Sequence, residues 1–75
     1  TPDRVVMTAE LQAQIRQCMA QLPEQFRLII VLRDIQGLSY EDIAELTGLN
    51  LGTVKSRLAR ARQKLQALIT PLLKS

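Results

Sequence analysis

Apolar residues recur at spacings of three and four along most of this chain, which is the pattern of amphipathic helices. Prolines and glycines fall between the periodic segments or near the chain ends. The chain has no sustained alternation of apolar and polar residues and no Asn-Gly or Asp-Gly turn, so strands are not expected. Its 75 residues have room for one core only. We therefore predict a small all-α domain of four helices.

Proline, glycine and capping residues set the expected helix ends. Residues 1–7 have no clear period and are predicted to be a linker, which leaves 8–75 for the domain. Thr8 would cap the first helix. That helix should end at Leu22, because Pro23 disfavours helical backbone in the residue before it.

The second helix is predicted to be the core element. Pro23 suits its first turn, and Gly37 would end it with left-handed backbone. Positions 26–32 are apolar except for Arg27. We therefore expect this helix to be buried on most sides.

The third and fourth predicted helices are joined by a short turn. Ser39 would cap the third helix, and Gly48 would end it. Its inward face would consist of Ile43, Ala44 and either Leu46 or Thr47. The fourth helix would follow the cap Asn50 and end at about Ile69, before Pro71. A short, glycine-containing turn between two helices is typical of a helix-turn-helix, although an ordinary helical hairpin would fit equally well.

Charge separates these two possibilities. Residues 1–50 carry seven acidic and four basic side chains, whereas residues 51–75 carry six basic ones and no acid. A solvated helix usually mixes both signs, because opposite charges four residues apart stabilise it. Five cations within residues 55–64 repel one another, and contacts with phosphate would offset that cost. The fourth helix is therefore predicted to bind double-stranded DNA.

The two sides of the predicted fourth helix indicate different roles. The side that should pack on the body is apolar and consists of Val54, Leu58, Ala61, Leu65, Leu68 and Leu72. On the other side, the first two turns would lie deepest in the major groove. The candidates for reading base edges are Lys55, Ser56, Ala59 and Arg60. The candidates for phosphate contact are Arg57, Arg62 and Lys64, with Ser39 and Tyr40 at the start of the third helix.

Other classes of function find little support in the residues. The chain has no histidine and one cysteine, Cys18, which lies on an apolar stripe where buried packing is expected. We therefore predict no zinc site, no other metal site and no disulfide. The absence of an apolar run near eighteen residues argues against a membrane span. Without a phosphate-cradling glycine loop or an activated nucleophile, no enzymatic activity and no cofactor are expected.

An ordered set of motifs resembles a known family. The motifs are Leu22-Pro23-Glu24, then Arg27, Ile30 and Leu32, then Gly37-Leu38-Ser39-Tyr40-Glu41-Asp42-Ile43-Ala44, and Gly52-Thr53-Val54-Lys55-Ser56-Arg57-Leu58-Ala59-Arg60-Ala61-Arg62. They resemble the C-terminal domain (region 4) of extracytoplasmic-function sigma factors, over about residues 8–70. The resemblance implies a bacterial cytoplasmic protein whose last helix recognises the minus thirty-five promoter element as a monomer. The resemblance also implies that Thr53 contacts DNA.

The resemblance also implies protein partners. In that family the domain docks on the flap-tip helix of the RNA polymerase β subunit through an apolar groove, and an anti-sigma factor often masks it. Here the groove is expected to draw on Ile29, Leu32, Leu68 and Leu72. The sigma domain that melts DNA would precede Thr1, since the abrupt start of the sequence is typical of a fragment.

Two alternatives stay open on sequence grounds. The DNA-binding domain of LuxR-type response regulators shares the fold and would dimerise on palindromes. It usually has Leu-Thr-x-Arg-Glu where this chain has Leu22-Pro23-Glu24-Gln25-Phe26, and histidine at the position of Arg57. The other alternative is an interaction module without a nucleic-acid role, because a basic amphipathic helix can bind acidic membranes or an acidic protein.

Overall fold

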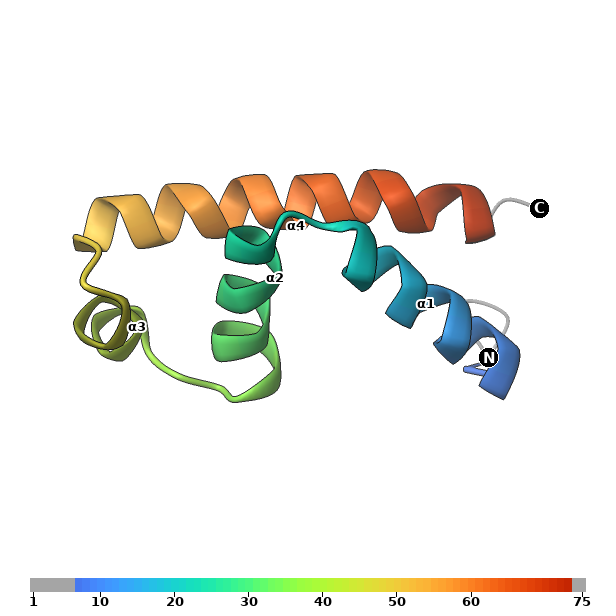
Figure 1. Ribbon diagram of the computed structural model, residues 1–75, viewed down its shortest axis with the longest axis horizontal. Helices are drawn as coiled ribbons and strands as arrows, with labels where there is room; N and C mark the ends of the chain where they lie inside the picture. Colours follow the sequence, from blue (N-terminus) through green and yellow to red (C-terminus); the bar gives the residue numbers. More distant parts are fainter. Residues whose placement is uncertain (1–6, 74–75) are drawn as a thin grey trace, which may run out of the picture.

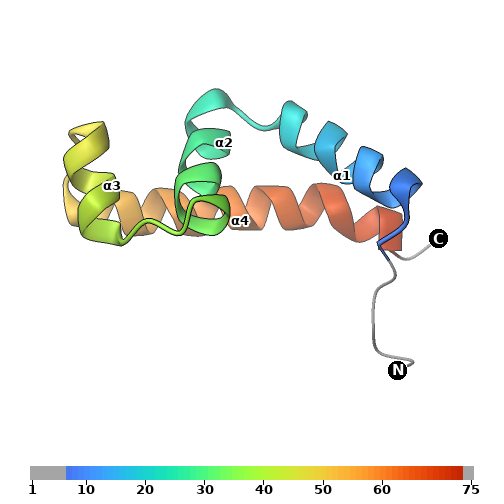
Figure 2. The same ribbon diagram turned by 90° about the horizontal axis from the view of Figure 1, so that it is seen from below.

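One long helix, α4 (Leu51–Leu73), runs the length of the computed structural model, and the other helices contact it at successive points (Figure 1). α1 (Ala9–Gln21) lies beside the C-terminal half of α4, α2 (Glu24–Ile30) meets its middle, and α3 (Tyr40–Thr47) lies at its N-terminal end (Figures 1 and 2). The structure describes residues 7–73, and their regular secondary structure is entirely helical, which confirms the predicted all-α class. The predicted linker lies outside the described residues except for Met7.

Three N-caps and two terminating glycines lie where the sequence predicted them. The side-chain oxygens of Thr8, Ser39 and Asn50 each accept a hydrogen bond from the backbone N–H three residues further on, at 3.0, 3.0 and 2.8 Å. Each bond satisfies an amide that has no partner within its helix. Gly37 and Gly48 have φ angles of 73° and 77°, in the left-handed region that glycine enters without steric cost. These two residues therefore terminate the second and third helical segments.

Gly48→Ala is expected to lower the free energy of unfolding by about 1–2 kcal/mol, because an L residue is strained in left-handed backbone. A Cβ at Gly48 would meet nothing within 4 Å, so the strain arises in the backbone alone. Gly52 is the matched control, because it is helical and its Cβ would make an ordinary 3.5 Å contact with Asn50 Oδ1. Gly52→Ala is expected to raise stability by about 0.5–1 kcal/mol. Urea unfolding measures both changes, and two changes of the same sign would contradict this account of Gly48.

The core lies where α4 packs on α2 and α3. Its buried residues are Leu22, Ile29, Ile30, Ile43, Val54, Leu58 and Ala61. The α4 members belong to the apolar side predicted for that helix, and Leu65, Leu68 and Leu72 are half-buried further along it. Cys18 is buried as expected, and its thiol donates to the carbonyl of Leu68 at 3.5 Å. The core is therefore small and centred on the first half of α4.

The prediction that the second helix is buried on most sides is wrong. α2 is followed directly by a wider π-helical turn, η1 (Val31–Ile35). Ile29 and Ile30 are buried, but Leu28 is 49% exposed and Ile35 is 67% exposed. Only one side of a helix can face α4, so this apolar run supplies surface as well as core.

The prediction that the fourth helix ends at about Ile69 is also wrong. α4 continues to Leu73 and includes Pro71. A proline this close to a helix end removes one backbone hydrogen bond. The apolar side continues to Leu72, which is half-buried. Packing of this last turn therefore outweighs the lost bond.

Candidate nucleic-acid interface

α3, the following turn and the first turns of α4 form a helix-turn-helix, in which α3 runs across α4 (Figures 1 and 2). Ile43 and Val54 fill the corner and are fully buried, with Leu49 half-buried beside them. The Thr47 hydroxyl donates to the Ile43 carbonyl at 2.7 Å and accepts from the Leu49 N–H at 3.3 Å. Thr47, and not the exposed Leu46, therefore completes the inward face of α3. This packed corner fixes how the start of α4 projects.

The side of α4 that faces away from the core is polar and exposed. Lys55, Ser56, Ala59 and Arg60, the candidates for base reading, are all exposed. Thr53 is half-buried at the start of the helix, and its carbonyl accepts from the Ser56 hydroxyl at 3.2 Å. α4 contains no acidic residue. The structure thus brings these five residues together on the first turns of one helix.

Basic residues follow both edges of this exposed side. Lys55 and Arg62 are seven residues apart, which is two helical turns, so they lie on one edge. Arg57 and Lys64 have the same spacing and lie on the opposite edge. A helix in the major groove has a phosphate backbone on each side. The two basic edges match that arrangement.

At the edge that carries Lys55, the start of α3 and η1 adjoin α4. The Arg33 guanidinium carbon lies 4.7 Å from the centre of the Tyr40 ring, and Lys55 Nζ lies 5.9 Å from it. Both distances are in the range of cation–π contacts. Arg33 also donates to the carbonyl of Leu38 at 2.8 Å. Tyr40 therefore joins a cation of η1 to a cation of α4, beside the N-cap Ser39.

Arg62, a predicted phosphate contact, forms an ion pair with Asp34. Its Nε donates to Oδ2 at 3.3 Å, and its Nη2 donates to Oδ1. The hydrogen bond with Asp34 raises the pKa of the Arg62 guanidinium. Neither Asp34 nor Arg33 was predicted from the sequence to belong to the site. An ion pair between residues 28 positions apart leaves no periodic signal in a sequence.

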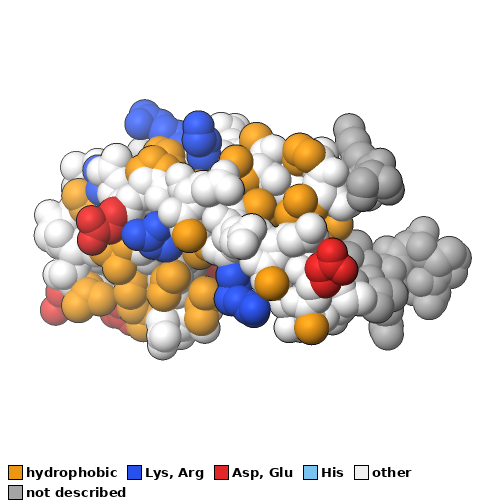
Figure 3. All heavy atoms as spheres, turned by 45° about the vertical axis from the view of Figure 1, so that its right-hand side comes forward, with side chains coloured by type: hydrophobic (Ala, Val, Ile, Leu, Met, Phe, Trp, Pro, Cys, Tyr) orange, Lys and Arg blue, Asp and Glu red, His pale blue; other side chains and the backbone are white. Residues whose placement is uncertain are grey.

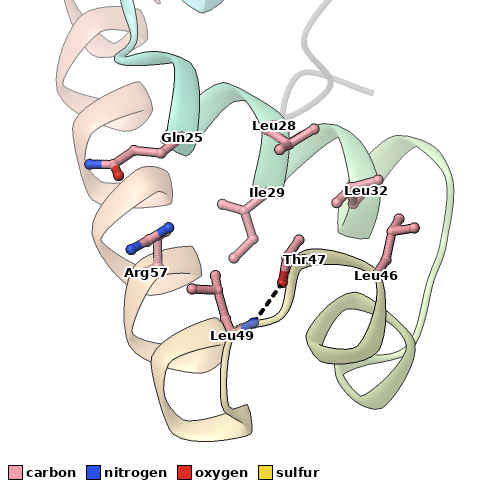
Figure 4. Close-up of a pocket in the computed structure, with 8 residues that line it drawn as sticks. All are labelled: Gln25, Leu28, Ile29, Leu32, Leu46, Thr47, Leu49 and Arg57. Atoms are coloured by element: carbon pink, nitrogen blue, oxygen red, sulfur yellow. Dashed lines mark hydrogen bonds between the residues drawn. The ribbon is translucent and has the colours of Figure 1, made fainter.

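The apolar groove is predicted from Ile29, Leu32, Leu68 and Leu72, of which two lie at one pocket. Ile29 and Leu32 line a pocket of about 320 Å³. Its lining residues are Gln25, Leu28, Ile29, Leu32, Leu46, Thr47, Leu49 and Arg57 (Figure 4). Leu68 and Leu72 belong to the C-terminal half of α4, which packs beside α1. The pocket thus includes Ile29 and Leu32 of the predicted groove, and Leu68 and Leu72 are not among its lining residues.

Exposed leucines surround this pocket. Leu46 is 67% exposed, and in the close-up it lies with Leu28 and Leu32, across from Gln25 and Arg57 (Figure 4). Hydrophobic side chains gather below α4, over the part of the molecule where α2, η1 and α3 lie (Figure 3). Clustered apolar side chains at the surface are a feature of binding sites.

Residues 7–73 contain neither a cluster of metal-ligating side chains nor a membrane-spanning helix. No group of three or more histidine, cysteine, aspartate or glutamate side chains there is placed to hold a metal ion. None of the helices in this range is long and apolar enough to cross a membrane.

Comparisons with known proteins identify the family to which the chain belongs. Residues 12–65 match the family model described as Sigma-70, region 4. The chain is 42% identical over 74 residues to the RNA polymerase sigma-H factor of Pseudomonas aeruginosa, across 99% of this chain and 38% of that protein. It is 41% identical over 73 residues to the ECF RNA polymerase sigma-E factor of Haemophilus influenzae, across 97% and 39%. It is 43% identical over 65 residues to the ECF RNA polymerase sigma factor SigE of Mycolicibacterium smegmatis, across 87% and 25%. The chain thus spans about two-fifths or less of the length of these relatives.

These matches decide between the two DNA-binding families that the sequence left open. The matched range includes all of α3 and the turn, and it extends to Leu65 in α4. The family model that matches describes a sigma factor region and not a LuxR-type domain. The sigma factor family is non-enzymatic. The chain belongs to the sigma-70 region 4 family and is homologous to ECF sigma factors over nearly its whole length.

Proposed function

We propose that this domain binds the minus thirty-five promoter element as part of an ECF sigma factor, and so directs transcription initiation by RNA polymerase in the bacterial cytoplasm. The observation that carries the proposal is the exposed, acid-free side of α4. Val54 and Leu58 anchor the opposite side of that helix in the core. In the proposed complex, the first turns of α4 lie in the major groove, where each base pair presents a distinct set of hydrogen-bonding groups.

The proposed roles differ between the centre and the edges of this side. Lys55 and Arg60 would donate to guanine O6 and N7, and the Ala59 methyl would contact a thymine methyl. Ser56 would bond to a base edge, and Thr53 would contact a base or the backbone at the start of the helix. The proposed phosphate contacts are Arg57, Arg62 and Lys64, with Ser39 and Tyr40 from the start of α3.

Selection of binding sites from a pool of random duplexes tests this function. We expect enrichment of an asymmetric site that one copy of the domain occupies. If three or four phosphates are neutralised, the logarithm of the binding constant should fall against the logarithm of salt concentration with a slope of about −3 to −4. A slope near zero would contradict the electrostatic part of the proposal. Tighter binding to acidic liposomes than to the selected duplex would favour an interaction module instead.

We also propose that the pocket between α2, η1 and α3 receives the flap-tip helix of the RNA polymerase β subunit, and that an anti-sigma factor competes for it. The apolar lining and the exposed Leu28 and Leu46 suit the apolar face of an amphipathic helix. Arg57 is the one α4 residue in this lining. Binding at the pocket would therefore leave most of the exposed side of α4 open to DNA.

Leu46→Gln is expected to weaken binding of a flap-tip peptide about tenfold, because it removes an apolar contact from the pocket rim. Leu46 is outside the core, so the melting temperature and the affinity for duplex DNA should stay unchanged. Leu73→Gln is the matched control, since Leu73 is 50% exposed and lies outside the pocket. Isothermal titration of the peptide measures the difference. Equal affinities for the two variants would argue against this docking site.

A further inference from the structure

We propose that Asp34 limits the affinity of this domain for duplex DNA, independently of base sequence, by pairing with Arg62. The proposal rests on the proposed DNA-binding function, because it concerns how strongly the same surface attracts phosphate. Asp34 lies in η1, outside the helix-turn-helix. Its carboxylate nevertheless reaches a cation of α4.

Arg62 is well placed to contact phosphate. It lies two turns after Lys55 on the same edge of α4, the edge beside Tyr40. Within residues 7–73 it is the one basic residue that forms an ion pair with an acidic side chain. The pair thus lowers the positive charge of the basic edge that the start of α3 borders.

The geometry of the pair sets up a competition with DNA. Asp34 occupies the Nε–Nη2 edge of the guanidinium. A phosphate binds arginine in a bidentate manner through the same kind of fork. A phosphate that approaches this edge must displace Asp34. One that approaches the other edge meets a guanidinium whose positive charge is partly compensated by the nearby carboxylate. In both cases Arg62 contributes less than a free arginine would.

The pair has little value for folding, because its two side chains are 49% and 40% exposed. Ion pairs between exposed side chains contribute little to stability. The turn that presents Asp34 is itself unusual, since the Gln36 N–H donates to the Val31 carbonyl at 2.9 Å in a π-helical turn. Such turns are rare and occur often at functional sites. Both observations favour a role for Asp34 in binding over one in stability.

Asp34→Asn tests the proposal by removing the charge while keeping the size. We expect the variant to bind a selected duplex and a random duplex of equal length more tightly, by the same factor of about threefold to tenfold at about 0.1 M salt. The salt slope should become steeper by about 0.9, as for one more neutralised phosphate. Fluorescence anisotropy at several salt concentrations measures both quantities.

Two further variants isolate the pair. Glu10→Gln makes the same change of charge on α1, at the other end of the molecule, and should alter affinity by less than about twofold. In an Arg62→Gln background, Asp34→Asn should tighten binding less than it does alone, because no arginine is released. A purely structural role for Asp34 would move the melting temperature and leave the salt slope unchanged.

Two results would overturn the proposal. Weaker binding by Asp34→Asn would mean that Asp34 orients Arg62 toward phosphate, and an unchanged affinity would mean that the pair does not matter for DNA. Failure of the unsubstituted domain to bind any duplex would overturn the proposed function as well. Measuring the unsubstituted domain first keeps the two failures distinguishable.

Discussion

Leu58→Ala is expected to lower the free energy of unfolding by about 2–5 kcal/mol. Leu58 is 2% exposed and belongs to the core that α4 forms with α2 and α3. Truncation removes its buried contacts and leaves a cavity that the neighbours fill only in part. A chain of 75 residues buries a small surface in total, so this loss is a large share of its stability.

Leu73→Ala provides the control for this prediction. It is the same truncation in the same helix, but Leu73 is exposed, so the expected loss is below about 1 kcal/mol. Urea unfolding followed by circular dichroism compares the two variants. If both variants unfolded at the same urea concentration as the unsubstituted domain, Leu58 would not be a core residue.

Lys55→Ala and Arg60→Ala are each expected to weaken binding to the selected duplex by about 1–3 kcal/mol and to relax the preference for one base. Both side chains are exposed on the first turns of α4, where a helix in the major groove reaches base edges. Their removal opens no cavity, so the domain should remain folded. Competition between the selected duplex and duplexes changed at single positions measures the loss of preference.

Lys64→Ala is the matched control for base reading. Lys64 lies further along α4 on the edge that it shares with Arg57, where a phosphate contact is proposed. This variant should weaken binding to the selected and to random duplexes equally and make the salt slope shallower by about 1. Should Arg60→Ala behave in the same way, Arg60 would contact phosphate and not a base.

Most helix ends could be predicted, because each of those ends depends on a residue close to it. A side-chain oxygen at Thr8, Ser39 or Asn50 reaches only the amides of the next turn. Likewise, left-handed backbone at Gly37 or Gly48 is a property of that one residue. Local chemistry of this kind can be recognised without knowledge of the tertiary structure.

Contacts between distant segments were harder to predict. The apolar run of the second helix does not reveal that Leu28 points outward, because periodicity is lost where almost every position is apolar. The continuation of α4 past Pro71 depends on packing of its last turn on the body, which a proline rule does not include. The π-helical turn after Ile30 has no simple sequence pattern either.

The same division applies to the candidate site. The exposed side of α4 follows from helical periodicity and from the absence of acids, both of which are visible in the sequence. The pairing of Arg62 with Asp34 and the pocket that Leu32 lines depend on how α2, η1, α3 and α4 are arranged in space. Those features arise from the tertiary structure and leave no pattern in the sequence.

The division of α4 into an exposed side and a buried side has an evolutionary consequence. In the proposed complex with promoter DNA, promoter preference and folding stability depend on different positions, so each could change under selection without compromising the other. Exchanges at Ser56, Ala59 or Arg60 would let a duplicated copy of the domain acquire a new set of target genes within a few steps. Changes at Val54 or Ala61 have no such freedom, because they alter the scaffold common to every variant.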